Sequence, residues 1–233
     1  MRLILLLLPA LLWSAGLLEE IDSRLQPFSY ESYRQLINIE PDGTQKEFVM
    51  YMIKKDREKV ASLFLSPASD KGRATLRRGE NMWLFIPGIA KPLRIASMQS
   101  VTGGVFNNAD IMRLDFSVEY DIAAQEEREG RYILQLKAKH GGVTYEALEM
   151  EVDKKSLFPE KIDCFAGGIL LKTIRYLKPK DFGNGIVRPS LLETTSPLQK
   201  GYKSLMLFGK IAKRDFDDAV FTLENLSRLD DLR

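Results

Sequence analysis

Side chains suited to catalysis at neutral pH are scarce in this chain of 233 residues, which has one histidine, His140, and one cysteine, Cys164. His140 precedes two glycines, and a histidine in that setting is far more often a solvated turn residue than a catalytic base. Cys164 stands in an apolar stretch, where a thiol usually acts as a small buried side chain. One imidazole and one thiolate cannot complete a four-ligand zinc site without carboxylates. We therefore predict no catalytic residue, no metal, no cofactor and no enzymatic activity.

The charged residues limit the possible partners. The chain has 34 Lys and Arg against 32 Asp and Glu, without a run of five like charges. Binding to a phosphate backbone requires a concentrated basic face, so we predict that nucleic acid is not a partner. A looser basic group, which could meet an acidic receptor or lipid headgroups but is more often a solvated face, consists of Lys71, Arg73, Arg77, Arg78, Lys91 and Arg94.

The N-terminus predicts export. Residues 1–16 combine a leucine-rich run with small residues, Ser14 and Gly16, that suit a signal peptidase. The apolar run is shorter than the roughly 20 residues that span a bilayer, and acidic residues follow it at once. We expect a signal peptide at 1–16 that is cleaved after Gly16, and a single monomeric domain over residues 17–233. A lone cysteine allows no intramolecular disulfide, so the core must provide the stability.

The spacing of apolar residues predicts a mainly β fold with a few helices. Leu17, Ile21 and Leu25 recur at four-residue spacing, which favours a short helix that Pro27 would end. From there to about residue 213, turn signals recur roughly every ten residues, as is typical of antiparallel hairpins. We expect a large curved antiparallel sheet, sandwich or incomplete barrel closed by short helices.

Two predicted strands, residues 48–53 and 60–65, are apolar on both faces, so both sides of the sheet must be covered there. The connections are too short for the helical crossovers of a parallel sheet. Helices or a lipid-sized cavity would therefore provide the cover. One C-terminal cover would be a helix with Thr222 as its N-cap residue.

A break in the strand pattern at residues 97–114 predicts a flap over one mouth of the sheet. Asn108 or Asp110 could cap a short helix within it, and Gly103-Gly104 would serve as a hinge or turn. The clearest hairpin surrounds residues 140–143, where two glycines can supply the positive φ angles of a two-residue turn.

The region from residue 65 to residue 95 carries a family resemblance. It contains Leu65-Ser66-Pro67, Asp70-Lys71-Gly72, Asn81-Met82-Trp83-Leu84-Phe85-Ile86-Pro87 and Lys91-Pro92-Leu93-Arg94-Ile95 in this order. The order resembles the LolA-like family of bacterial outer-membrane lipoprotein-sorting proteins, with Phe85 where the family usually has tyrosine. A later segment, Phe106 to Asp110, is less similar. The positions that match the family's motifs are Pro67, Gly72, Trp83, Pro87, Arg94 and Asp110.

The resemblance implies an incomplete antiparallel barrel, closed by helices, with an apolar cavity that holds lipid or the acyl chains of lipoproteins in the periplasm. It also implies an inner-membrane donor complex and an outer-membrane acceptor. Trp83 and Phe85 are equally compatible with ordinary core positions that touch no ligand. The residues that we expect to line the cavity are Met50, Met52, Phe64, Trp83, Phe85, Leu134 and Leu148.

We therefore predict a periplasmic carrier that moves lipid or acyl chains toward the outer membrane without enzymatic chemistry. The alternative is a sensing or scaffold domain that resembles the RseB-type regulators and binds envelope proteins. Those regulators have an additional C-terminal domain, for which this chain leaves little room. An enzyme ranks third, because it would need an unusual site built from carboxylates or His140.

Overall fold

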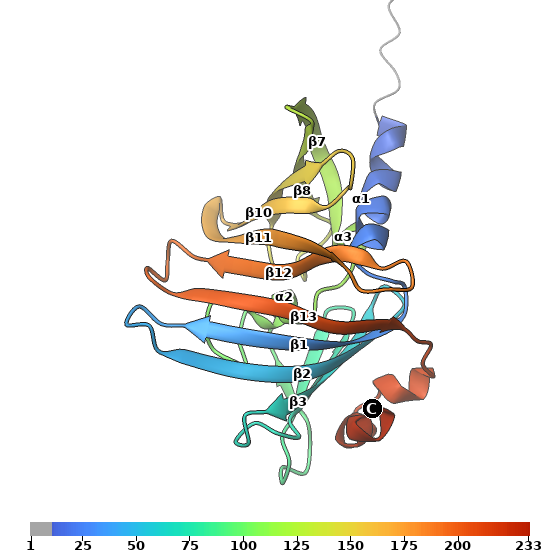
Figure 1. Cartoon of the computed structure of the whole chain (residues 1–233), viewed down its shortest axis with the longest axis vertical. Coiled ribbons are helices and arrows are strands. Elements are labelled where there is room, and N and C mark those ends of the chain that lie inside the picture. Colours follow the sequence, from blue (N-terminus) through green and yellow to red (C-terminus); the bar gives the residue numbers. More distant parts are fainter. Residues whose placement is uncertain (1–10) are drawn as a thin grey trace, which may run out of the picture.

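The computed structural model describes residues 11–233, so most of the predicted export signal lies outside the described residues. Within that range, thirteen strands form one antiparallel sheet (Figure 1). The strand order runs β6-β5-β4-β3-β2-β1-β13-β12-β11-β10-β9-β8-β7, and the two end strands do not pair with each other. The prediction of a mainly β fold with a large, incompletely closed antiparallel sheet is confirmed.

The strands vary from three to thirteen residues. Their bounds are β1 Tyr30–Ile39, β2 Gln45–Lys55, β3 Lys59–Ser66, β4 Ala74–Arg78, β5 Asn81–Phe85, β6 Leu93–Ile95, β7 Tyr120–Arg128, β8 Arg131–Ala138, β9 Ala147–Asp153, β10 Pro159–Ala166, β11 Ile169–Asp181, β12 Val187–Thr195 and β13 Lys203–Lys213. The helices are α1 Leu11–Leu25, the single-turn helices α2 Asn108–Ile111 and α3 Phe116–Glu119, and the 3₁₀ helices η1 Asp218–Phe221 and η2 Leu226–Leu232.

The connection from β6 to β7 determines how the sheet is covered. These two strands follow one another along the chain, yet they form opposite edges of the sheet. Residues 96–119, which we call the closing segment, therefore cross one face of the sheet and contain α2 and α3. We call this face the inner face. The region predicted as a flap is a connection anchored at both ends.

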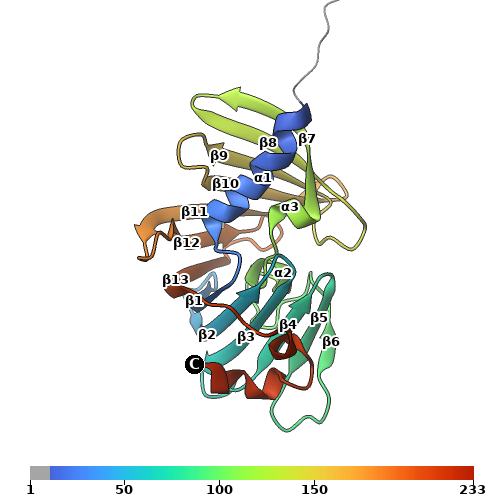
Figure 2. The ribbon, with the colours of Figure 1, turned by 90° about the vertical axis from the view of Figure 1, so that its right-hand side faces the viewer.

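Helix α1 and the closing segment cover the main hydrophobic core on the inner face (Figure 2). Leu18, Ile21 and Leu25 form the buried stripe of α1, at spacings of three and four residues. Ile21 and Leu25 take the predicted positions, whereas Leu17 is only partly buried against the same core. The helix ends at Leu25, two residues before Pro27. Within residues 11–233, no helix is long and apolar enough to cross a membrane.

A second hydrophobic cluster lies on the opposite, outer face, where η1 and η2 cover β3 and β4 (Figure 2). Strands β2 and β3 are buried on both faces for this reason. Met50 and Phe64 belong to the inner core, whereas Tyr51 and Leu63 belong to the outer cluster. The prediction that both faces of these strands need a cover is confirmed.

The C-terminal helix prediction is wrong in detail. Asp217 precedes the first turn, and its carboxylate accepts a hydrogen bond from the backbone N–H of Ala219. Thr222 follows that turn, and its hydroxyl donates to the carbonyl of Ala219. An acidic residue that satisfies free N–H groups is the stronger cap, so the helix begins before the predicted position.

The hairpin predicted around residues 140–143 is present, because β8 pairs with β9, but the prediction of a two-residue turn with positive φ angles is wrong. Strand β8 ends at Ala138 and β9 begins at Ala147, and neither Gly141 nor Gly142 has a positive φ. The connection instead reaches the turn between β4 and β5, where Nδ1 of His140 lies 2.8 Å from a carboxylate oxygen of Glu80. A turn remains at residues 140–143, where the N–H of Val143 donates to the carbonyl of His140 at 3.3 Å, but it lies within a longer connection that also contacts the other half of the sheet.

The outer cover predicts a difference between two identical substitutions. Phe221 is 1% exposed beneath η2, whereas Phe28 is 61% exposed. We expect Phe221→Ala to lower the free energy of unfolding by about 3 to 5 kcal/mol and Phe28→Ala by no more than about 0.5 kcal/mol. Urea unfolding of both variants measures the difference, and equal losses would contradict a packed outer cover.

Candidate ligand-binding site

A small apolar cavity lies between the closing segment and the inner face of the sheet. Phe106, Ala109 and Phe116 line it from the closing segment, and residues from β9 to β12 line it from below: Leu148, Ile162, Cys164, Ile174, Tyr176 and Leu192. Its volume is about 40 Å³, against the roughly 10 to 15 Å³ that a cavity needs to hold one water molecule. Side chains therefore fill most of the expected cavity, and an acyl chain needs the closing segment to move.

The structure separates the residues that the sequence grouped as cavity-lining. Met50, Met52, Phe64, Leu134 and Leu148 belong to the inner core, and Leu148 also contacts the cavity. Trp83 and Phe85 instead pack against the outer cluster. Successive strand residues point to opposite faces, and in β5 Met82 takes the inner position. The structure therefore does not bring the two aromatic residues together with the other five.

Most motif positions lie near the β6 edge of the sheet. Pro67 and Gly72 belong to the turn between β3 and β4, and a Cβ atom added to Gly72 would lie 3.1 Å from the ring of Pro87. Trp83 and Arg94 are paired residues of β5 and β6. These positions support the sheet edge where the closing segment begins.

Asp110, the remaining motif position, stabilises α2. Its carboxylate accepts a hydrogen bond from the backbone N–H of Asn107, and the Asn107 side chain accepts one from the N–H of Asp110. This reciprocal pair forms a capping box. The Tyr145 hydroxyl donates to Asp110 at 2.8 Å, and burial first, then Asp110, raises the pKa of Tyr145 well above its usual range.

Buried cations of the sheet hold the closing segment through its backbone carbonyls. Arg34 on β1 donates to Ile111 at 2.9 Å, and Arg77 on β4 donates to Met112 at 3.2 Å. Lys172 on β11 donates to Val105 and pairs with Asp110 at 2.8 Å. Arg77 also pairs with Glu119. We call the contacts of these three cations the polar clasps.

Arg77 corrects the prediction of a solvated basic face. It is buried, because it projects toward the closing segment and uses its guanidinium there. Arg73, also in the predicted group, pairs with Asp70 and lies over the Phe64 ring.

Gly104 permits the closest approach of the closing segment to the sheet. Its φ is +73°, and an added Cβ atom would lie 2.1 Å from the Asn38 side-chain oxygen and 2.7 Å from the Ser204 hydroxyl. Asn38 donates to the carbonyls of Thr102 and Gly103. Only glycine fits this turn without displacing the sheet side chains.

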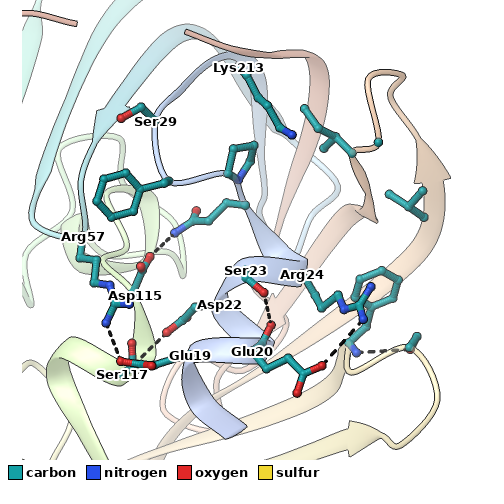
Figure 3. Close-up of a pocket in the computed structure, with 18 of the residues that line it drawn as sticks. Glu19, Glu20, Asp22, Ser23, Arg24, Ser29, Arg57, Asp115, Ser117 and Lys213 are labelled. Atoms are coloured by element: carbon teal, nitrogen blue, oxygen red, sulfur yellow. Dashed lines mark hydrogen bonds and ion pairs between the residues drawn. The ribbon is translucent and has the colours of Figure 1, made fainter. Parts of the chain in front are cut away.

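A larger groove of about 1030 Å³ opens beside α1 (Figure 3). Its walls carry charges of both signs, including a 2.8 Å ion pair between Arg57 and Glu19. Gln26 and Asp115 also line the groove, and Gln26 donates to Asp115 at 2.8 Å. This polar lining suits water or headgroups better than an acyl chain.

Beneath the groove, a group of buried polar residues was not identified from the sequence. Tyr30 donates to Gln26 and accepts from Arg34, while Lys54 pairs with Asp115 at 2.6 Å. Arg188 is 2% exposed. A signal was available, because Tyr30 and Arg34 share the inward parity of Leu36 in an alternating strand.

The catalytic candidates are poorly placed for chemistry. Burial raises the pKa of the Cys164 thiol well above its usual range, so the reactive thiolate is suppressed. His140 is half exposed and lies beside Glu80. Within the part of the chain that the structure describes, no three His, Cys, Asp or Glu side chains gather in a metal-binding arrangement.

Comparisons with known proteins agree with this architecture. A protein family described as “Uncharacterized protein” matches residues 56–228. A LolA superfamily protein from Nitrosomonas europaea superposes with a TM-score of 0.81 at 26% identity, over 91% of this chain and 98% of that chain. A comparison with curated protein sequences found no match.

Two further structures share the fold at lower identity. A DUF1329 family protein from Desulfovibrio piger has a TM-score of 0.77 at 20% identity, over 91% of this chain and 97% of that chain. A structure described as an outer membrane lipoprotein-sorting protein domain from Vibrio parahaemolyticus has a TM-score of 0.75 at 16% identity, over 93% and 99%.

Chemical labelling of Cys164, which lines the cavity, tests directly whether the polar clasps control access to it. We expect Lys172→Met to accelerate iodoacetamide labelling of Cys164 about tenfold to a hundredfold, since a buried charge-assisted contact contributes about 1.5 to 3 kcal/mol. Lys172 lowers the thiol pKa, so its removal alone would slow labelling. Mass spectrometry of timed samples gives the rates.

The matched control is Lys161→Met, which removes a surface lysine from the strand that carries Cys164. We expect it to label at the wild-type rate. If Lys172→Met labels no faster than this control at equal global stability, the clasps do not control access.

Proposed function

We propose that this chain, which has the LolA-like fold, carries lipid, or the acyl chains of lipoproteins, through the periplasm. The ligand occupies the inner core beneath the closing segment. Residues 1–16 serve as the cleaved export signal, and residues 17–233 work as one monomeric domain. The chain receives cargo from an inner-membrane donor and passes it to an outer-membrane acceptor.

The observation that carries this proposal is the contrast between the apolar cavity and the polar fastening of its cover. The cavity walls are mostly aliphatic and aromatic side chains. The cover is held by hydrogen bonds and ion pairs from Arg34, Arg77 and Lys172. Polar contacts can be exchanged for water when the segment moves, so opening does not require the whole sheet to unfold.

The energies are compatible with a cavity that the ligand itself opens. Burial of an acyl chain contributes about 0.8 kcal/mol per methylene, so about a dozen carbons supply roughly 10 kcal/mol of gross attraction. Each polar clasp costs about 1 to 3 kcal/mol to break. Ordering of the chain offsets part of the remainder. Met50 and Met52 of the inner core can repack around chains of different length.

Release follows from relative affinities. The periplasm supplies no ATP, so cargo moves to an acceptor that binds it more tightly. No catalytic group takes part in this cycle, in keeping with the suppressed thiolate of Cys164.

Native mass spectrometry of the mature protein, purified gently from the periplasm of an expressing bacterium, tests the proposal. We expect a co-purifying acylated species that solvent extraction removes and added lipid restores. Ala109→Phe, which fills the cavity from α2, should reduce uptake at least about tenfold, because the displaced methylenes lose their burial.

Two folded variants serve as controls. Ala124→Phe makes the same change at an exposed site on β7, and Trp83→Leu changes a side chain of the outer cluster. Both should retain uptake. A clean protein mass with no lipid uptake would reject the carrier and favour a scaffold that binds envelope proteins.

A further inference from the structure

The interior of the sheet carries an excess of positive charge. The buried charged residues among 11–233 comprise five cations and three carboxylates. Lys54 pairs with Asp115, and Arg77 pairs with Glu119. The less buried Arg113 lies 3.7 Å from Asp22, and Asp110 pairs with Lys172. These four pairs leave Arg34 and Arg188 without a carboxylate among the described residues.

Arg34 on β1 and Arg188 on β12 both pack against one aromatic ring of the strand between them, β13. Their guanidinium carbons lie 4.8 Å and 3.9 Å from the centre of the Phe208 ring. The Nε atom of Arg34 and the Nη1 atom of Arg188 are buried and have no hydrogen-bond partner within residues 11–233. Each of these two cations thus keeps a buried donor that the described residues do not satisfy.

The surroundings respond to this charge. Burial alone would raise the pKa of the Tyr30 hydroxyl, yet Arg34, then Lys54, Arg188 and Arg113, bring that pKa below its ordinary value. Burial first, and then the charges of Arg34 and Arg113, lower the pKa of Arg188 to about 9. At neutral pH both arginines remain charged at an energetic cost. An incoming anion would remove that cost.

Each of the two arginines interacts with a residue that leads to one of the two hollows of the molecule. Arg34 donates to Tyr30, which contacts Gln26 in the lining of the groove. Arg188 acts electrostatically on Tyr176, which lines the apolar cavity. A headgroup at the pair would therefore face the groove, while its acyl chain enters the cavity.

We propose that Arg34 and Arg188 bind the oxyanion headgroup, carboxylate or phosphate, of an amphiphile whose acyl chain occupies the inner cavity. This inference rests on the proposed carrier function and narrows its cargo to anionic lipids. Guanidinium groups suit this role because they bind two oxygens at once and keep their charge when buried. Movement of the closing segment from Ile111 also frees Nη1 of Arg34 for the ligand.

A headgroup series with one chain length tests the proposal. Calorimetric titration of the delipidated protein at pH 7.5 compares dodecanoate, dodecyl phosphate and dodecanol below their aggregation concentrations. Inorganic phosphate is titrated separately. We expect both anions to bind at least about tenfold more tightly than dodecanol, because hydrogen bonds to charged groups exceed neutral ones by roughly that factor.

Arg188→Met separates ligand binding from structural support. We expect it to lose the preference for anions and to leave the melting temperature of the empty protein unchanged or higher, since an unpaired buried charge has been removed. Arg188 is preferred over Arg34, which also clasps the closing segment. Arg175→Met, an exposed change on β11, should alter neither quantity.

The outcomes distinguish this inference from the carrier proposal. Equal affinity for dodecanol and dodecanoate, unchanged in Arg188→Met, overturns the anion centre and leaves the carrier intact. Stabilisation by inorganic phosphate alone, without binding of any dodecyl compound, overturns the amphiphile as ligand. Strong destabilisation of Arg188→Met with unchanged anion preference assigns the residue a structural role.

Discussion

The placement of β6 and β7 at opposite edges of the sheet is the constraint on which the rest of the structure depends. The chain between them must cross the inner face, and it brings backbone carbonyls into a region without bulk water. Buried carbonyls need hydrogen-bond donors. Arg34, Arg77 and Lys172 supply those donors from three separated strands. Topology therefore explains why a hydrophobic interior contains so many cations.

The two faces of the sheet are closed by different physical means. The outer cover packs aromatic and aliphatic side chains such as Phe216, Phe221 and Leu226 against β3 and β4. Its contact energy is lost only when apolar surface is exposed to water. The inner cover also packs apolar side chains such as Phe106 and Phe116 into the core, but it is fastened in addition by polar contacts, which can exchange partners. A permanent lid on one face and a replaceable one on the other give a single sheet both stability and access.

Sequence reasoning predicted the sheet, helix α1 and the need for two covers because these follow from periodicity alone. The position of Trp83 depends on strand parity, which the apolar run Met82 to Phe85 leaves open. The prediction of a two-residue turn near His140 was wrong because the connection also contacts Glu80, sixty residues away in the chain. Such long-range contacts leave no local pattern.

The buried arginines were not identified from the sequence for a related reason. Arg77 and Arg188 look like surface residues by composition, since arginine is seldom fully buried. Only the path of the closing segment and the pairing of β11 to β13 place them inside. Arg34 was the accessible exception, because its strand alternates cleanly. The charged side chain of Arg34 at an inward position of β1 was a signal in the sequence that the interior contains buried cations.

The closing segment spans the curved sheet from one edge to the other, because it joins the edge strands β6 and β7. Its extra length lies in the helices α2 and α3, each four residues long, which would lengthen if they unwound. Helical residues advance about 1.5 Å each and extended residues about 3.3 Å, so unwinding one of these turns releases roughly 7 Å of chain. A flatter sheet would separate its two edges and require this extra chain length, whereas a more curved sheet would not. A partner that changed only the curvature of the sheet would therefore favour or oppose the unwinding of α2 and α3 without contacting the ligand.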